Sequence, residues 1–92
     1  MPRPTKEVKR ILEKKGFTLE NGDHNYYVIY KNGKKTRINT KVSHGSHKDI
    51  DNGLLSKMQK QMHLSKKQFN DYFDCHMSGD EYIEYLESQN LI

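Results

Sequence analysis

The sequence of 92 residues lacks tryptophan, has a single cysteine and contains no long hydrophobic run. One cysteine cannot form a disulfide within the chain, which excludes a small disulfide-stabilised secreted scaffold. No segment reaches the length that a membrane-spanning helix needs. The start, Met-Pro-Arg-Pro, leads into a charged segment without the apolar stretch of a signal peptide. We therefore expect a cytoplasmic protein without a membrane anchor.

Apolar residues are also scarce, at 33% of the chain. A chain of this length has room for one core only, so residues 1–92 are expected to form a single domain. The six tyrosines and three phenylalanines must then supply much of the buried area, because an aromatic ring buries more surface than an aliphatic side chain.

Positive charge exceeds negative charge, with 16 Lys and Arg against 12 Asp and Glu, a net charge of +4. Basic residues dominate from Met1 to Lys67, whereas Asp71–Glu87 is acidic. A basic balance favours phosphate-rich partners, nucleic acid above all, because neutralising phosphates releases counterions. At a charge of only +4, a solvated surface without a ligand is an equally good interpretation.

Several segments carry helical signals. A first helix begins near Thr5, its candidate N-cap, and Gly16 provides a left-handed stop. Beyond a polar loop, Lys41–Asn52, an apolar stripe of Leu and Met predicts a second helix. The capping-box patterns that start at Ser65 and Ser78 predict two further helices.

Three strands are predicted between the first helix and the polar loop. Residues 17–20 alternate in polarity, and His24–Lys31 is dense in aromatic and β-branched residues. Asn32-Gly33 predicts a tight hairpin, because a type I′ turn needs positive φ at both positions, and Lys34–Thr40 returns as the third strand. The order α-β-β-β-α with extra C-terminal helices predicts an α+β fold, a three-stranded antiparallel sheet with helices on one face. Double-stranded-RNA-binding domains have this layout, although a fold alone does not give function.

A two-residue turn fixes the pairing of the hairpin strands. The predicted pairs are Lys31–Lys34, Tyr30–Lys35, Ile29–Thr36, Val28–Arg37, Tyr27–Ile38, Tyr26–Asn39 and His24–Lys41. Opposed residues share a face of the sheet, so Tyr27 and Ile38 are expected on the buried face.

The other face of the hairpin interleaves cations with aromatic rings and ends in a histidine. Lys and Arg suit phosphates, Tyr suits base stacking, and His transfers protons near neutral pH. An ordinary amphipathic sheet with a wet basic face is the alternative interpretation. The residues predicted on this face are His24, Tyr26, Val28, Tyr30, Lys35, Arg37 and Lys41.

Six short motifs resemble, in order, those of the HicA-type mRNA interferase toxins. They are Glu13-Lys14-Lys15-Gly16-Phe17, Gly22-Asp23-His24, His44-Gly45, Lys48-Asp49-Ile50, Gly53-Leu54 and Leu64-Ser65. Each motif is weak alone, and their order and spacing carry the resemblance. It covers a core of residues 5–70 and leaves residues 71–92 as a C-terminal helical extension. Asp23 stands where the family has Ser, and Asn25 where many members have a second His.

The resemblance implies a metal-independent endoribonuclease that cleaves mRNA, with His24 as its one catalytic histidine, neutralised by a HicB-type antitoxin. His24 would take a proton from a ribose 2′-hydroxyl or give one to the leaving oxygen. From the register argument, Lys35, Arg37 or Lys41 would stabilise the charge that develops on phosphate. The other candidate residues are Tyr26 and Tyr30 for RNA binding, and Gly22, Asp23 and His44 in supporting roles.

The remaining histidines and the cysteine do not predict a metal site or another cofactor. His44 and His47 form one loose pair, and Cys75 and His76 are adjacent, whereas structural zinc sites use two spaced pairs. Two other functions remain open, which are RNA binding without catalysis and interaction of the basic face with an acidic protein. RNA cleavage separates catalysis from plain RNA binding, and salt-dependent RNA affinity separates RNA binding from protein binding.

Overall fold

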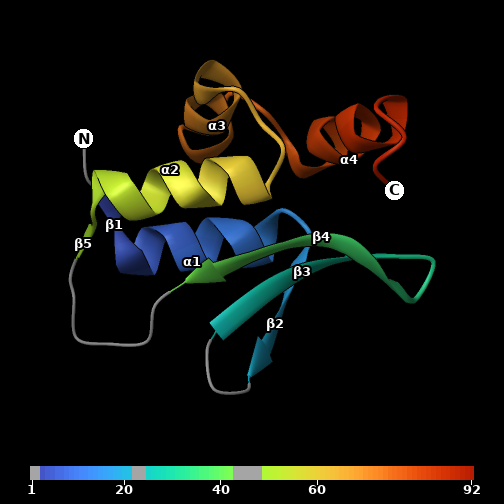
Figure 1. Cartoon of the computed structure of the whole chain (residues 1–92), viewed down its shortest axis with the longest axis horizontal. Helices are drawn as coiled ribbons and strands as arrows, with labels where there is room; N and C mark the ends of the chain where they lie inside the picture. The colour runs from blue at the N-terminus through green and yellow to red at the C-terminus, as the bar shows by residue number, and fades with distance from the viewer. Residues whose placement is uncertain (1–2, 22–24, 43–48) are drawn as a thin grey trace.

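The computed structural model describes residues 3–21, 25–42 and 49–92, and its architecture is α+β, as the sequence predicts. Its elements are β1 (Arg3–Pro4), α1 (Thr5–Lys14), β2 (Phe17–Asn21), β3 (Asn25–Lys31), β4 (Lys34–Val42), β5 (Asp49–Ile50), α2 (Asn52–Gln61), α3 (Lys66–Phe73) and α4 (Gly79–Ser88). Strands β2-β3-β4 form an antiparallel sheet, β1 pairs with β5, and the helices lie on one side of the sheet (Figure 1). None of the helices in the described segments is long and apolar enough to cross a membrane.

Helix α1 begins differently from the prediction. Pro4, paired with Asp49 in the β1–β5 ladder, is extended (φ −59°, ψ 127°) and occupies the N-cap position. Thr5, the predicted N-cap, is already helical and buried, so its hydroxyl cannot cap the helix from outside. The end of α1 agrees with the prediction, because Gly16 follows it with a φ of +108°, which favours glycine.

The hairpin between β3 and β4 turns at Asn32-Gly33, as predicted. Their φ values are +53° and +77°, the positive pair that a type I′ turn requires. Lys31 pairs with Lys34 and Tyr30 with Lys35, so the predicted register is confirmed next to the turn.

Beyond Tyr30 the predicted register is wrong, because β4 contains a bulge. One residue separates Val28 from Tyr30, whereas three residues separate their partners, Asn39 and Lys35. Within the bulge, the Thr36 hydroxyl donates to the Ile29 carbonyl at 2.6 Å and accepts from the Ile38 N–H at 3.2 Å. This side chain takes over hydrogen bonds that a regular ladder would make between backbones. The observed pairs here are Val28–Asn39, Tyr27–Thr40, Tyr26–Lys41 and Asn25–Val42.

The two additional residues of the bulge shift the pairing but preserve the faces, because side chains alternate with a period of two. Tyr27 and Ile38 are 1% and 0% exposed, so the predicted buried face is confirmed. Tyr26 and Tyr30 are each 38% exposed on the opposite face.

The segment predicted as one polar loop, Lys41–Asn52, is partly structured. Lys41 and Val42 extend β4, Asp49 and Ile50 form β5, and residues 43–48 lie outside the described part of the chain. Val42 and Ile50 are both buried in the core. The pairing of β5 with β1 joins residues far apart in the sequence, which no local pattern indicates.

The C-terminal helices complete the hydrophobic core. Capping boxes at Ser65 and Ser78 start α3 and α4, as predicted. From α4, the fully buried Tyr82 stacks on Phe17 with 5.9 Å between ring centroids, and its hydroxyl donates to the Met62 carbonyl at 2.8 Å. The core cluster therefore contains residues from the sheet and from all four described helices.

Candidate nucleic-acid interface

The predicted catalytic residue lies outside the described part of the chain, together with its neighbours Gly22 and Asp23 and with His44. In the sequence His24 precedes Asn25, the first residue of β3, and Asn25 pairs with Val42 at the end of β4.

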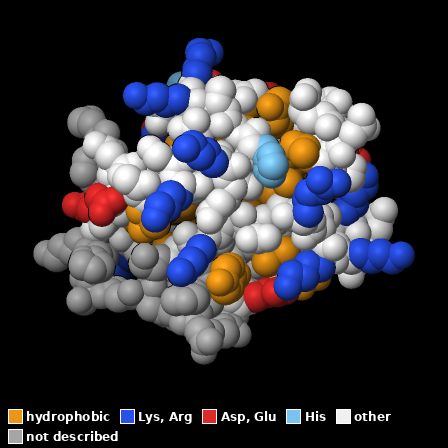
Figure 2. Space-filling view, viewed as in Figure 1, with side chains coloured by type: hydrophobic (Ala, Val, Ile, Leu, Met, Phe, Trp, Pro, Cys, Tyr) orange, Lys and Arg blue, Asp and Glu red, His pale blue; other side chains and the backbone are white. Residues whose placement is uncertain are grey.

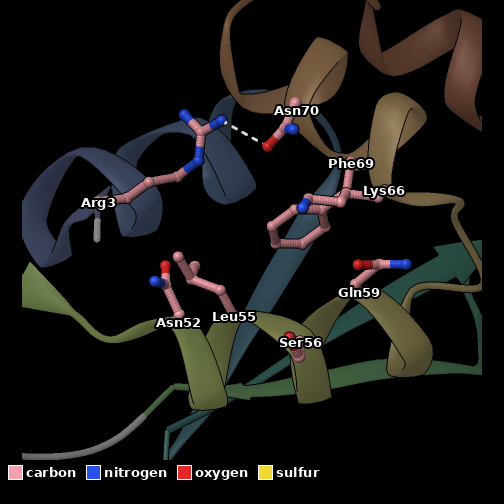
Figure 3. Close-up of a pocket in the computed structure, with 8 residues that line it drawn as sticks. All are labelled: Arg3, Asn52, Leu55, Ser56, Gln59, Lys66, Phe69 and Asn70. Carbon is pink, nitrogen blue, oxygen red and sulfur yellow. Dashed lines mark hydrogen bonds between the residues drawn. The ribbon is translucent and has the colours of Figure 1, made fainter. Parts of the chain in front are cut away.

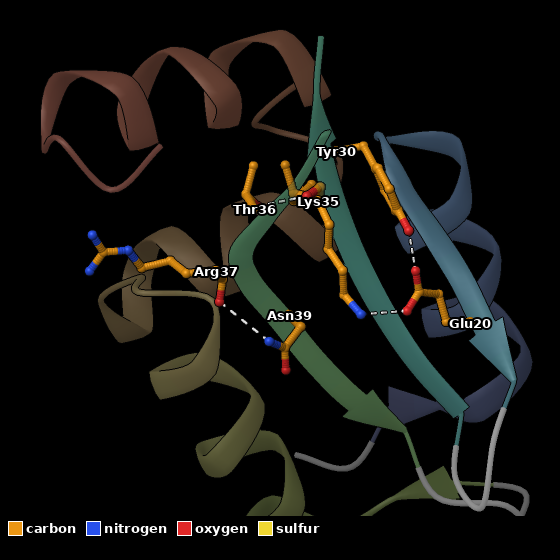
Figure 4. Close-up of polar contacts among 7 residues, drawn as sticks. Glu20, Tyr30, Lys35, Thr36, Arg37 and Asn39 are labelled. Atoms are coloured by element: carbon orange, nitrogen blue, oxygen red, sulfur yellow. Dashed lines mark hydrogen bonds and ion pairs between the residues drawn. The ribbon is translucent and has the colours of Figure 1, made fainter. Parts of the chain in front are cut away.

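At the opposite end, near the hairpin turn, the structure brings Tyr30 and Lys35 together with an acidic residue that the face argument missed (Figure 4). The Lys35 ammonium donates to Glu20 Oε1 at 2.8 Å, and the Tyr30 hydroxyl donates to Glu20 Oε2. One carboxylate on β2 thus joins a tyrosine of β3 and a lysine of β4 across all three strands.

These contacts shift the titration of all three groups. Hydrogen bonds from Lys35 and then Tyr30 lower the pKa of Glu20 below its ordinary value. The hydrogen bond to Glu20 raises the pKa of Lys35 and also that of Tyr30. Glu20 therefore stays ionised at neutral pH, and the charge that Lys35 was expected to offer to phosphate is shared with a neighbouring carboxylate.

Alternation along β2 is the sequence signal that could have placed Glu20 on this face. Phe17 and Leu19 point to the core, so Thr18 and Glu20 fall on the opposite face. Glu20 pairs with Tyr26 in the β2–β3 ladder. The residues predicted on this face all came from the β3–β4 hairpin, so Glu20 of β2 was missed.

Lys41 lies near the end of β4, and its strand partner differs from the prediction. It pairs with Tyr26, not with His24, because of the bulge. Its backbone N–H donates to Gln61 Oε1 at 3.2 Å, and the same oxygen accepts from the buried Thr40 hydroxyl at 2.7 Å. Gln61 of α2 therefore fixes the backbone at Lys41.

Arg37 lies neither with Tyr30 and Lys35 nor with Tyr26 and Lys41. It lies within the bulge, is exposed, and in Figure 4 points away from Glu20 and Lys35. Its carbonyl accepts from the Asn39 amide at 3.3 Å. The structure therefore brings Tyr30 with Lys35 and Tyr26 with Lys41, and leaves Arg37 apart.

The sheet face that carries Glu20, Tyr26, Tyr30, Lys35 and Lys41 is called the open sheet face. A shallow hollow of about 230 Å³ lies on it between these two pairs. Val28, which is 1% exposed, lines it, and an aromatic ring and charged groups surround it. The exposed Tyr26 side chain offers a stacking surface and the charged groups offer polar contacts, which single-stranded nucleic acids use. The lining residues are Glu20, Tyr26, Val28, Lys35 and Asn39.

Comparison with known proteins supplies the decisive observation. The family model of the HicA toxin of bacterial toxin–antitoxin systems matches residues 5–64, which is more than half of the chain. The chain belongs to the HicA toxin family. No curated protein and no solved structure gives a significant match to this HicA-family chain. The matched segment includes strands β2, β3 and β4 and the Gly22-Asp23-His24 motif, and it ends before α3. Helices α3 and α4 therefore follow the matched segment; a C-terminal helical extension agrees with the sequence, but the match ends at residue 64 and not at residue 70.

A second hollow of this HicA-family chain, about 240 Å³, lies between Arg3, α2 and α3 (Figure 3). The Arg3 guanidinium donates to Asn70 Oδ1 and to Asp74 Oδ1, both at 3.0 Å, and lies 5.7 Å from the centre of the Phe73 ring. These three contacts engage Arg3 with α3 and fix the short β1 strand against that helix. We therefore assign this arginine a structural role.

Charge alone does not mark a binding site on the face shown in Figure 2. On the face shown in Figure 2, Lys and Arg side chains are spread widely among neutral ones, with few acidic groups. Among the residues that the structure describes, no group of three His, Cys, Asp or Glu side chains could hold a metal ion. The open sheet face is therefore the candidate interface, because there charged groups, aromatic rings and a hollow occur together.

Proposed function

We propose that this HicA-family chain is an endoribonuclease that cleaves mRNA in the cytoplasm, with His24 as its catalytic residue and without a metal ion. The observation that carries the proposal is the family match, which spans the Gly22-Asp23-His24 motif. The open sheet face supports it, because Tyr26 and Tyr30 expose aromatic surface and Lys41 pairs with Tyr26 on that face.

The proposed chemistry is transfer within the RNA strand. His24 takes the proton of a ribose 2′-hydroxyl, and the resulting oxygen attacks the adjacent phosphorus. The bond from phosphorus to the 5′-oxygen breaks, that oxygen takes a proton from water as it leaves, and His24 returns its proton to the solvent. Lys41 stabilises the negative charge that develops on the phosphate oxygens. The products are one strand with a 2′,3′-cyclic phosphate and one with a 5′-hydroxyl.

A toxin of this family has an antitoxin as its partner, and we propose that this partner is of the HicB type. An antitoxin that covers the open sheet face would exclude RNA from Tyr26, Tyr30 and Lys41 at once. Its contact surface would be acidic where it meets Lys41, since like charges across an interface are costly.

Cleavage of a defined RNA tests the catalytic proposal. The purified protein is incubated with a labelled RNA in excess EDTA, and the ends of the products are identified by mass spectrometry. We expect 2′,3′-cyclic phosphate and 5′-hydroxyl ends, and no cleavage at a position that carries a single 2′-deoxyribose. RNA that is bound but never cleaved would favour the non-catalytic RNA-binding module instead. Cleavage that proceeds at the 2′-deoxy position would contradict the proposed attack.

A further inference from the structure

We propose that Glu20 makes the open sheet face selective for guanine in single-stranded RNA. The inference rests on the proposed RNA binding and specifies which base the open sheet face binds. The Glu20 carboxylate lies among aromatic and basic groups of a surface predicted to contact a polyanion, where a negative charge opposes phosphate binding.

The orientation of the Glu20 carboxylate is fixed by its two donors. Lys35 donates to Oε1 at 2.8 Å, and the Tyr30 hydroxyl donates to Oε2. A carboxylate oxygen has two lone pairs, so each oxygen keeps one for a further donor. The hydrogen bonds hold the two oxygens in place, and Glu20 lines the hollow beside Val28 and Asn39. The result is a pair of adjacent acceptors at the edge of this hollow.

Guanine is the base whose Watson–Crick edge fits such a pair. Its N1–H and its N2 amino group are adjacent donors that point in the same direction, so both can bind one carboxylate. Adenine and cytosine each place an acceptor nitrogen next to their amino group, and uracil has a single N–H between two carbonyl oxygens. An acceptor forced against Glu20 would lose its hydrogen bond to water without gaining another.

The surroundings of Glu20 favour a nucleotide over a protein side chain. The Tyr26 ring, 38% exposed, offers a stacking surface at the same hollow. Lys35 lines the hollow, and Lys41 pairs with Tyr26 at the next position along the sheet. These cations attract the phosphates on either side of a base, whereas they repel an arginine, the protein side chain that also presents two parallel donors.

Affinities for short RNAs test the inference without any need for cleavage. The probes are fluorescent pentanucleotides of uridine with G, inosine, A, C or U in the centre, 2′-O-methylated throughout so that no strand scission can occur. Binding to the full chain is followed by fluorescence anisotropy. We expect the G probe to bind about 5- to 100-fold more tightly than the A, C and U probes, the range of one bidentate base contact. Inosine lacks the N2 amino group and is expected to lie between G and the others.

The decisive variant is Glu20→Gln, with Glu84→Gln on the exposed side of α4 as the matched control. Glu20→Gln replaces one acceptor by a donor, so the preference for G should disappear. Its affinity for the all-uridine probe should not fall, because the substitution removes a negative charge from the face. Glu84→Gln should keep the wild-type order of affinities. Glu20→Asp retains the charge but withdraws the oxygens by one methylene, and it should also lose the preference. Circular dichroism checks that each variant is folded.

The outcomes separate this inference from the proposed function. If all five probes bind equally to the wild type, or if Glu20→Gln retains the preference for G, the inference is overturned while RNA binding stands. If no probe binds at low salt, both proposals are overturned. A peptide with one arginine among alanines serves as a competitor. Suppose that this peptide displaces a probe from the wild type but not from Glu20→Gln, and that the wild type shows no preference for G. The carboxylate would then be assigned to a protein partner, and the proposal would be overturned.

Discussion

Glu20 holds the ammonium group of Lys35 at 2.8 Å on the open face of the sheet. This interaction changes the interpretation of the basic face, because one of the cations predicted to bind phosphate, Lys35, is already paired. Lys41, at the other end of the face, has no ion pair among the described residues. Phosphate binding is therefore expected to depend more on Lys41 than on Lys35.

The Glu20 hydrogen bonds predict a specific dependence of stability on pH. Because folding lowers the pKa of Glu20 below its ordinary value of 4.5, its ionised form stabilises the fold above that pH. The contribution disappears as the pH falls through the lower folded-state pKa. Urea unfolding from about pH 7 to about pH 3 should show the wild type more stable than Glu20→Gln at neutral pH, with the difference vanishing in acid. A difference that persists unchanged at the acid end would contradict the assignment.

RNA affinity should depend on which lysines are reversed, not only on net charge. Glutamate at Lys35, Arg37 and Lys41 is compared with glutamate at three exposed helical lysines, Lys6, Lys57 and Lys60, so that both variants have the same net charge. We expect the sheet-face variant to bind RNA weakly and to lower the slope of log affinity against log salt by about 0.7 for each phosphate that the protein no longer neutralises. The helical variant should stay close to the wild type. An equal fall in affinity for the two variants would show that the binding surface lies elsewhere.

Local sequence signals predicted most of the fold. Asn32-Gly33 and the boxes at Ser65 and Ser78 are complete within a few residues, and each is confirmed. The bulge in β4 was not predicted, because it depends on the Thr36 hydroxyl replacing ladder hydrogen bonds, and Thr is also an ordinary strand residue. The β1–β5 pair was missed for another reason, since its two strands come together only through the tertiary fold.

The candidate site was predicted only in part. The sequence placed Tyr30 opposite Lys35 correctly, because that pair lies next to the turn. The bulge between Val28 and Tyr30 shifts every pair beyond it by two residues, so Lys41 pairs with Tyr26 and the predicted pairing of His24 with Lys41 was wrong. The role of His24 itself came from the family motif and not from geometry, and it stays a prediction.

Close packing between α4 and the end of α1 predicts that a small substitution will loosen the C-terminal extension. A methyl group added at Gly79 would lie 2.8 Å from the Lys15 carbonyl oxygen and 3.0 Å from Lys15 Cα. Gly79→Ala should therefore lower the free energy of unfolding by about 1–3 kcal/mol, because backbone atoms cannot move aside cheaply. Thermal and urea unfolding measure the change.

The matched control for this substitution is Gly53→Ala in α2. The nearest atom to its added methyl group is Asp51 Oδ1, at an ordinary 3.4 Å. Alanine there should be neutral or stabilising by up to about 1 kcal/mol, the gain in helix propensity. If Gly79→Ala were as stable as Gly53→Ala, the close approach of α4 to α1 would be refuted.

The most direct test of the central claim is RNA cleavage by His24→Ala beside the wild type. His76→Ala is the control, because His76 is exposed in the α3–α4 connection, beyond the matched segment of residues 5–64. Loss of a general acid or base lowers the rate about 100- to 10,000-fold. We expect that loss in His24→Ala and wild-type cleavage in His76→Ala. Circular dichroism checks that each variant is folded, and the arrest of cell growth by each variant is compared with that by the wild type. A folded His24→Ala protein that cleaves RNA and arrests growth at the wild-type level would contradict the account.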